Sequence, residues 1–193
     1  MRMNSKDTMA FGGRLLIGAT GSAAVATLPA YINALRTTFT GTVTVMMTHT
    51  AAAFLPPSTV GLFADRVVTS DAPSTWARQN HSTLAEEHDM MAVLPATAHI
   101  LSAVATGAAP NMLAATVLTA TFPVVFFPVM SGEMWAKPAV SRNVQQLTSD
   151  GYRVVDPPWG QRYDVAFGDF VKAPMPPAPP QFVDVVRELM PIR

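Results

Sequence analysis

The residues of this sequence that could do chemistry lie in four short turns, each directly after an apolar or β-branched run. These turns are residues 18–22 (GATGS), 48–50 (THT), 95–99 (PATAH) and 130–132 (MSG). Glycine and hydroxyl residues ahead of a helix present backbone N–H groups that suit a phosphate. The first turn is not GxGxxG and has no Walker lysine, so a nucleoside triphosphate is not expected. Taken alone, this turn is equally compatible with a tight connection that binds nothing.

Histidine is the side chain best suited to proton transfer near neutral pH, and the chain has four: His49, His81, His88 and His99. Their spacing matches no zinc motif, so no metal is expected. A lone histidine after an asparagine, such as His81 after Asn80, ordinarily has a capping or core role. The chain has no cysteine, which excludes disulfides and thiolate catalysis by the protein and favours a cytoplasmic location.

The charge content is low, at 13% of 193 residues, and the net charge is zero. A chain of this length predicts one domain with a substantial core. No basic surface for nucleic acid or for an anionic membrane is expected. So few charges suggest a surface covered by a ligand, by further subunits or by both.

Residues 90–132 contain no Asp, Glu, Lys or Arg. Prolines divide this stretch into pieces shorter than a spanning helix of roughly 20 residues. We interpret it as the buried centre of a sheet and expect no membrane segment, with a membrane location as the alternative. The amino terminus loosely resembles a signal peptide, but the charge of Asp7 and Arg14 favours a disordered leader over residues 1–13.

Apolar or β-branched runs alternate with helical stretches along the chain. Strands are predicted at 14–17, 41–46, 66–68, 90–94, 124–127 and 152–155. The segment around Trp76 is predicted to be a loop with one helical turn. This alternation indicates an α/β fold, a doubly wound parallel sheet in a Rossmann-like three-layer α/β/α arrangement. Because parallel strands end at one edge, a single ligand could lie across the four turns.

The composition changes after residue 155. We predict an α/β domain over residues 14–155, a Pro-rich substrate flap over 156–180 and a C-terminal helix over 181–193. The flap carries Trp159, Tyr163 and Phe170. It is too irregular for core and too aromatic for an inert linker, so we expect a mobile segment that orders on a ligand.

Five motifs in order resemble the homo-oligomeric flavin-containing cysteine decarboxylases. This family includes phosphopantothenoylcysteine decarboxylase and the peptidyl-cysteine decarboxylases of lantibiotic and related peptide pathways. The motifs are IGATGSAAV (17–25), Asn80-His81, LPATAHI (94–100), Gly107 with NML (111–113), and PVMSGEMW (128–135). The resemblance covers roughly residues 15–155 and implies a flavin-binding domain there.

Four positions depart from the family pattern. His99 and Ile100 replace the Asn and Thr of its PASANT motif, and Pro110 replaces an acidic residue. Ser131 replaces the Asn of its PxMNxxMW motif, which holds the substrate carboxylate. Serine is a shorter donor with one hydroxyl, so the carboxylate contact is the function most affected.

The resemblance also implies a mechanism. A flavin accepts a hydride from the Cβ of a cysteine with a free carboxylate, CO₂ then leaves, and an enethiol remains. A base must take the thiol proton, and imidazole is suited to it. The family pattern assigns that function to His81, whereas His88 and His49 are expected to be mainly structural.

The site residues that the resemblance implies fall into three groups. Catalysis is assigned to His81 and Ser131, and substrate binding to Asn80, Ser131, Met134 and Trp159. Cofactor binding is assigned to Gly18, Thr20, Gly21, Ser22, Thr48, Thr50, Phe54, Pro95, Thr97, Ala98, His99 and Met130. For Met130 and Met134, a core pair is the alternative. The cofactor is expected to be FMN, with FAD as the alternative.

The absence of cysteine distinguishes between branches of the family. The coenzyme A branch relies on a flap cysteine to reduce its enethiol, and this chain has none. We therefore expect oxidative decarboxylation of the C-terminal cysteine of a ribosomal precursor peptide, giving an enethiol for an aminovinyl-cysteine ring. The expected assembly is a homo-oligomer, a trimer or a dodecamer. A phosphopantothenoylcysteine decarboxylase-like enzyme and a non-catalytic regulatory flavoprotein remain alternatives, and a flavin prenyltransferase fits only the first motif.

Overall fold

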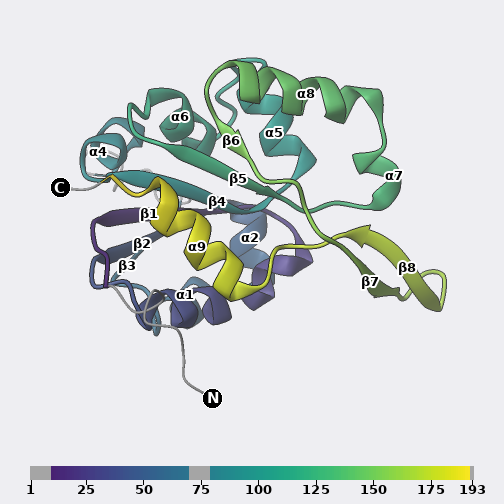
Figure 1. Ribbon diagram of the computed structural model, residues 1–193, viewed down its shortest axis with the longest axis horizontal. Helices are drawn as coiled ribbons and strands as arrows, with labels where there is room; N and C mark the ends of the chain where they lie inside the picture. The colour runs from purple at the N-terminus through teal and green to yellow at the C-terminus, as the bar shows by residue number, and fades with distance from the viewer. Residues whose placement is uncertain (1–9, 70–78, 192–193) are drawn as a thin grey trace.

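A six-stranded, all-parallel sheet is the centre of the computed structural model, which describes residues 10–69 and 79–191 (Figure 1). Its order is β3-β2-β1-β4-β5-β6. The strands are β1 (Arg14–Ala19), β2 (Thr42–Met47), β3 (Arg66–Thr69), β4 (Met90–Ala96), β5 (Val124–Pro128) and β6 (Arg153–Val154). The order reverses between β1 and β4, where doubly wound folds bind ligands at the carboxyl edge. The predicted doubly wound α/β fold is confirmed. The predicted loop around Trp76 lies outside the described residues.

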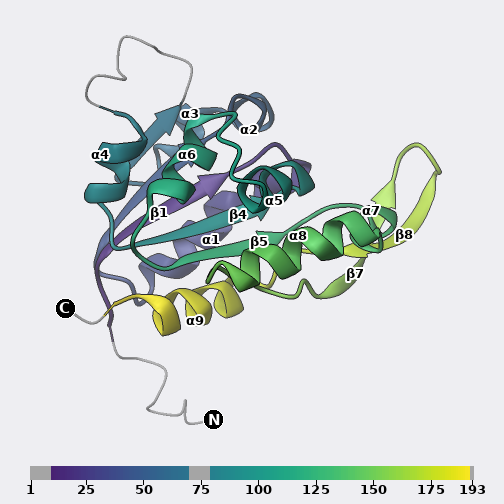
Figure 2. The same cartoon turned by 90° about the horizontal axis from the view of Figure 1, so that it is seen from above.

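Helices cover both faces of the sheet, which is why its strands are nearly continuous apolar runs. One face carries α1 (Leu28–Arg36) and α9 (Pro179–Leu189), and the other carries α4 (His81–Glu86), α5 (Ala98–Ala105), α6 (Met112–Thr119) and α8 (Pro138–Ser149) (Figures 1 and 2). Successive strand residues alternate between the two cores: Phe127 packs towards α9, and Phe126 towards α5 and α8. The result is the predicted three-layer arrangement.

Four short helices complete the described fold. They are η1 (Ala23–Thr27), α2 (His49–Phe54), α3 (Pro57–Val60) and α7 (Gly132–Trp135). All but α3, which follows α2, come directly after a strand end. Residues 90–132, which have no ionisable acid or base other than His99, run through β4, α5, α6 and β5 in the middle of the molecule. Within residues 10–69 and 79–191, no helix is long and apolar enough to cross a membrane.

Part of the predicted leader is ordered. Residues 1–9 lie outside the described residues, but the Phe11 ring packs 5.0 Å from that of Phe39, and the Phe11 N–H donates to the Thr38 carbonyl. The Arg187 guanidinium of α9 lies over the same Phe11 ring. Residues 10–13 therefore belong to the fold, because this aromatic contact anchors them.

The predicted flap forms a regular antiparallel hairpin, β7 (Trp159–Asp164) and β8 (Asp169–Pro174), which projects beyond the sheet (Figures 1 and 2). The expectation of an irregular segment was wrong for these residues. The prolines lie before β7 or at and after the end of β8, so they leave the ladder between the two strands intact. The Tyr31 hydroxyl donates to the Pro177 carbonyl at 2.6 Å and anchors the chain that leaves the hairpin.

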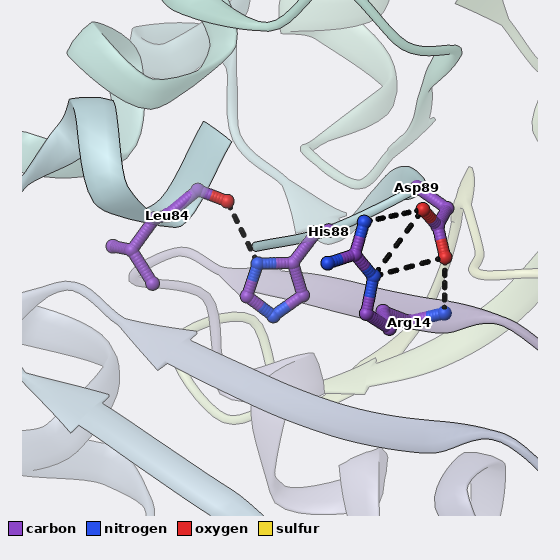
Figure 3. Close-up of polar contacts among 4 residues, drawn as sticks. All are labelled: Arg14, Leu84, His88 and Asp89. Atoms are coloured by element: carbon purple, nitrogen blue, oxygen red, sulfur yellow. Dashed lines mark hydrogen bonds and ion pairs between the residues drawn. The ribbon is translucent and has the colours of Figure 1, made fainter. Parts of the chain in front are cut away.

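His88 lies in the core just before the start of β4, whereas the turn at 95–99 lies at the other end of that strand (Figure 3). Its Nδ1 is 2.7 Å from the Leu84 carbonyl oxygen, so Nδ1 is the protonated nitrogen of the neutral ring. Next to it, the Arg14 guanidinium pairs with the Asp89 carboxylate at 2.7 Å and joins the starts of β1 and β4. Burial lowers the pKa of His88. The expected structural function of His88 is confirmed.

This environment predicts a stability effect at mildly acidic pH. The folded-state pKa of His88 lies below its unfolded value of 6.5, so the unfolded chain takes up the proton first. The free energy of unfolding should stay constant above about pH 6.5, the unfolded-state pKa, and decrease as the pH falls below it. A His88→Gln variant keeps a donor for Leu84 but does not titrate, so its melting temperature should fall less between about pH 7.5 and 5.5. Exposed His99→Gln is the control, and parallel curves for wild type and His88→Gln would contradict the prediction.

Candidate functional site

Thr20 joins two of the four turns at the carboxyl edge of the sheet. Its Oγ1 donates to the Pro95 carbonyl at 2.7 Å and accepts from the Thr97 N–H at 3.1 Å. The Thr48 N–H donates to the Ala19 carbonyl at 3.0 Å, which brings in the second turn. The ends of β1, β2 and β4 are therefore held in one fixed cluster, as the sequence predicted.

Gly21 lets the first and second turns approach closely. A Cβ atom at this position would lie 2.5 Å from Thr50 Cγ2, closer than non-bonded carbons come. Ser22 caps η1 by accepting from the Ala24 N–H, and Thr48 caps α2 by accepting from the Ala51 N–H. Local sequence thus explains each turn: a strand ends, a hydroxyl caps the next helix, and glycine leaves the space between them.

The cluster encloses what we call the central cavity, with a volume of about 330 Å³. Hydroxyl and imidazole groups dominate its lining, and none of its described lining residues is Lys, Arg, Asp or Glu. They are Thr20, Gly21, Thr48, His49, Thr50, Thr97, His99, Ile100 and Asn111. The volume falls in the range of small-molecule sites. The donor set suits a polyol chain and a phosphate held by neutral donors, so these residues fit the flavin that the sequence predicts.

A second cavity, here the hairpin cavity, lies between η1, the turn after β5, and β7–β8. Its volume is about 380 Å³, and it is lined by Ser22, Ala23, Ala24, Thr27, Val129, Met130, Ser131, Arg162, Ala173, Pro174, Met175 and Pro176. Gly21 of the central cavity and Ser22 of the hairpin cavity are consecutive residues, so the first turn contributes to both. Ser131 Oγ accepts from the Met134 N–H at 3.2 Å and caps α7.

His81 lines a third cavity, of about 680 Å³, with Asn80 and residues 109–112 and 115. The side-chain Oδ1 of Asn80 accepts hydrogen bonds from the backbone N–H groups of Ser82 and Thr83, so Asn80 caps α4. This cap places His81 at the exposed first position of the helix. Asn111 lines both this cavity and the central one.

The structure gathers many of the predicted site residues but separates the two catalytic candidates. His81 belongs to α4 and lines a cavity with residues 109–112 and 115, whereas Ser131 lines the hairpin cavity with η1 and the hairpin. The central cavity shares Asn111 with the cavity of His81, and its Gly21 is followed by Ser22 of the hairpin cavity. Among the described residues, His81 and Ser131 therefore line separate cavities.

The remaining predicted residues lie around these cavities. Gly18 is buried inside β1, where a Cβ atom would meet Met91 and Leu113, so it serves helix packing. Phe54 ends α2 and Met134 lies on α7, both exposed, and Ala98 begins α5. Trp159 contributes to a pocket on the hairpin's other face. Sequence reasoning did not assign Asn111 or Arg162 to the site; Asn111 lay within a matched motif, but no local signal marked Arg162.

Comparison with known proteins identifies the family. The model of the family described as Flavoprotein matches residues 3–190. The chain belongs to this flavoprotein family. It is 36% identical to mersacidin decarboxylase of Bacillus sp. over 155 residues, which cover 80% of this flavoprotein and 79% of that relative. The resemblance to flavin-containing cysteine decarboxylases is thereby confirmed.

Solved structures share the fold of the flavoprotein. The peptidyl-cysteine decarboxylase EpiD superposes with a TM-score of 0.80 at 25% identity, covering 92% of this chain and 99% of EpiD. SpaF, described as an FMN-dependent cysteine decarboxylase, superposes with a TM-score of 0.69 at 35% identity, covering 81% of this chain and 88% of SpaF. The hairpin and the cavities at the carboxyl edge are thus parts of a flavoprotein of cysteine decarboxylase type.

A Gly21→Ala variant tests the central cavity. The added methyl group should push the first turn away from Thr50 and weaken flavin binding by about 10- to 100-fold, the range expected for overpacking a close contact. Flavin absorbance per chain after purification measures the effect. Gly61→Ala is the matched control, since its nearest neighbour would be 3.5 Å away. Full flavin retention in Gly21→Ala would contradict this placement of the cofactor.

Proposed function

We propose that this flavoprotein is an FMN-dependent peptidyl-cysteine decarboxylase acting on the C-terminal cysteine of a ribosomal precursor peptide. The observation that carries the proposal is the junction at Gly21 and Ser22 between the hydroxyl-lined central cavity and the hairpin cavity. The first suits a cofactor, and the second suits a peptide end covered by β7–β8. The similarity to mersacidin decarboxylase and to EpiD, whose name states peptidyl-cysteine decarboxylation, supports it.

The reaction balances as an oxidation. A terminal –NH–CH(COOH)–CH₂–SH group becomes –NH–CH=CH–SH, with loss of CO₂ and of two hydrogens. FMN, when bound, would supply the acceptor for the hydride that leaves Cβ with both electrons. Residues of the central cavity that would hold it include Thr20, Thr50 and Thr97, with His99 replacing the family Asn.

The protein's own residues orient the cysteine and move its protons. His81 takes the thiol proton, because a thiolate releases a hydride from Cβ more readily than a thiol does. The Asn80 cap keeps α4 in register, so the imidazole stays at the mouth of its cavity. The apolar residues of the hairpin cavity, such as Met130, Ala173 and Pro174, exclude water from the carboxylate that leaves.

The absence of cysteine limits the reaction to the oxidised product. Returning an enethiol to a saturated thiol needs a hydride, which reduced FMN could supply, and a proton, and this chain has no thiol to donate that proton. The proposal therefore favours the peptide-modifying branch over the coenzyme A branch. The enethiol is then free for an aminovinyl-cysteine ring, and a chain without cysteine suits the cytoplasm.

We extend the proposal to a homo-oligomer, a trimer or a dodecamer. Two lines support it: His81 and Ser131 line separate cavities of one chain, and large apolar side chains are exposed near α2 and α3. Phe54 is 54% exposed and Leu62 is 80% exposed. A neighbouring copy would cover these side chains and bring its His81 to the hairpin cavity.

The direct test uses the FMN-loaded protein and a pool of synthetic peptides with a C-terminal cysteine. Mass spectrometry should detect products lighter by CO₂ and two hydrogens. The same peptides ending in serine are the control, because serine has no thiol to activate. If no cysteine-terminal peptide changes mass in this way, the proposed function is wrong.

A further inference from the structure

The hairpin cavity contains one charged side chain among its described lining residues, Arg162 of β7. The rest of the lining is apolar except for the hydroxyls of Ser22, Thr27 and Ser131. The Arg162 side chain is 50% exposed, so water screens its charge in part, but an anion that entered the cavity would meet this cation. Arg162 therefore determines which charge this cavity accepts.

The register of the hairpin places Arg162 on the cavity side. Side chains of a strand alternate between its two faces, and Arg162 pairs with Val171, two residues before the cavity residue Ala173 on β8. Lys172, the neighbour of Ala173, lines a different pocket with Trp159 and Gln161. The hairpin thus carries one cation on each face, and only that of Arg162 lines the cavity that Ser131 lines.

A carboxylate on the same strand holds the Arg162 side chain. Arg162 Nη2 donates to Asp164 Oδ2 at 3.1 Å, and Asp164 Oδ1 accepts from the Ala166 N–H at 3.0 Å. A guanidinium has five N–H donors in a planar fork, so this contact occupies a minority of them. The remaining donors have the geometry for a bidentate carboxylate contact.

We infer that Arg162 binds the α-carboxylate of the peptide's C-terminal cysteine and selects peptides with a free C-terminus. This inference rests on the proposed function. Ser131 stands where the family Asn holds that carboxylate, and its oxygen already accepts from the Met134 N–H. The single hydroxyl hydrogen of Ser131 offsets little of the free energy that it costs to move a carboxylate out of water. A guanidinium supplies both a positive charge and two aligned donors.

The chemistry of decarboxylation determines which kinetic constant depends on Arg162. The carboxylate charge moves into the carbon skeleton as CO₂ leaves, so the ion pair is stronger in the bound peptide than in the transition state. An interaction of this kind lowers Kd and KM and adds nothing to kcat. Arg162 is therefore a specificity-determining residue, with Asp164 as its positioning partner.

The test compares two forms of one peptide that ends in cysteine. One form has a free C-terminal carboxylate (the acid), and the other has a C-terminal carboxamide (the amide). Binding is measured by fluorescence anisotropy on FMN-loaded His81→Asn protein, whose turnover should be too slow to consume the peptide. This protein should prefer the acid by about 10- to 100-fold, the range for a hydrogen bond to a charged group. An added Arg162→Gln should weaken acid binding alone and bring the ratio near one. An added Arg162→Lys should restore part of the preference, and an added Lys172→Gln should leave it intact.

Two results would overturn the inference without affecting the proposed function. The acid preference could persist in Arg162→Gln, in which case another group holds the carboxylate. Arg162→Gln could also weaken acid and amide equally, in which case the residue supports the hairpin only. If wild-type protein decarboxylates none of the cysteine-terminal peptides, the proposed function fails and the inference fails with it.

Discussion

Replacing His81 with asparagine is expected to lower kcat/KM for a cysteine-terminal peptide by about 10²- to 10⁴-fold, the usual contribution of a general base. Bound FMN should be retained, because His81 lies outside the central cavity. Asparagine is also compatible with the first turn of α4, and the cap from Asn80 is unchanged. The measurement is peptide turnover by mass spectrometry alongside flavin absorbance per chain.

The matched control is Ser82→Ala, the next exposed residue of α4, where the cap uses only the backbone N–H. It should leave turnover unchanged. Wild-type turnover in His81→Asn would remove this residue from the mechanism. Joint loss of turnover and flavin would instead assign it a structural function. Retained flavin without any turnover in the wild-type protein itself would favour a regulatory flavoprotein.

Co-expressing two inactive variants should restore activity if each active site draws His81 from one copy and the hairpin cavity from another. The two variants are His81→Asn, which lacks the base, and Ala24→Trp, whose indole would fill the hairpin cavity. Random mixing in equal amounts leaves about a quarter of such sites with both wild-type components in a closed cyclic assembly. Turnover near that fraction of wild type is expected, far above either variant alone.

The control for this experiment places both substitutions in one chain and mixes it with wild-type protein. In a cross-subunit arrangement, about a quarter of the sites in that mixture remain fully wild type, whereas a self-contained site would keep about half. If the co-expressed variants show only the sum of the activities that each has separately, each subunit contains its own complete active site. Light scattering of the purified protein would in addition establish the number of subunits.

Much of the fold could be predicted because its strands are nearly continuous apolar runs. Met90 to Leu94 and Val124 to Phe127 are buried on both faces, a pattern that only a covered parallel sheet requires. The turns were predictable for a related reason, since a hydroxyl such as Thr48 or Ser22 caps a helix in a purely local way.

The hairpin and the division of the site could not be predicted in this way. Nothing in the local sequence of β7 shows that Arg162 and Ser131 line the same cavity. Their proximity depends on how α8 and β6, which connect them along the chain, are placed. The abundant prolines of residues 156–180 suggested irregular chain, yet they flank the ladder and leave it intact. The separation of His81 from Ser131 likewise depends on tertiary placement, because α4 and the turn after β5 contribute to different cavities.

The alternation of cations on the hairpin limits how its length can change. Inserting one residue into β7 ahead of Arg162 would rotate the guanidinium to the outer face and bring an uncharged neighbour into the cavity. Only changes of two residues preserve the orientation of every side chain, whereas the tip at residues 165–168 lies beyond the paired positions and can vary in length. The length of the hairpin should therefore vary by two residues at a time within its strands and freely at its tip.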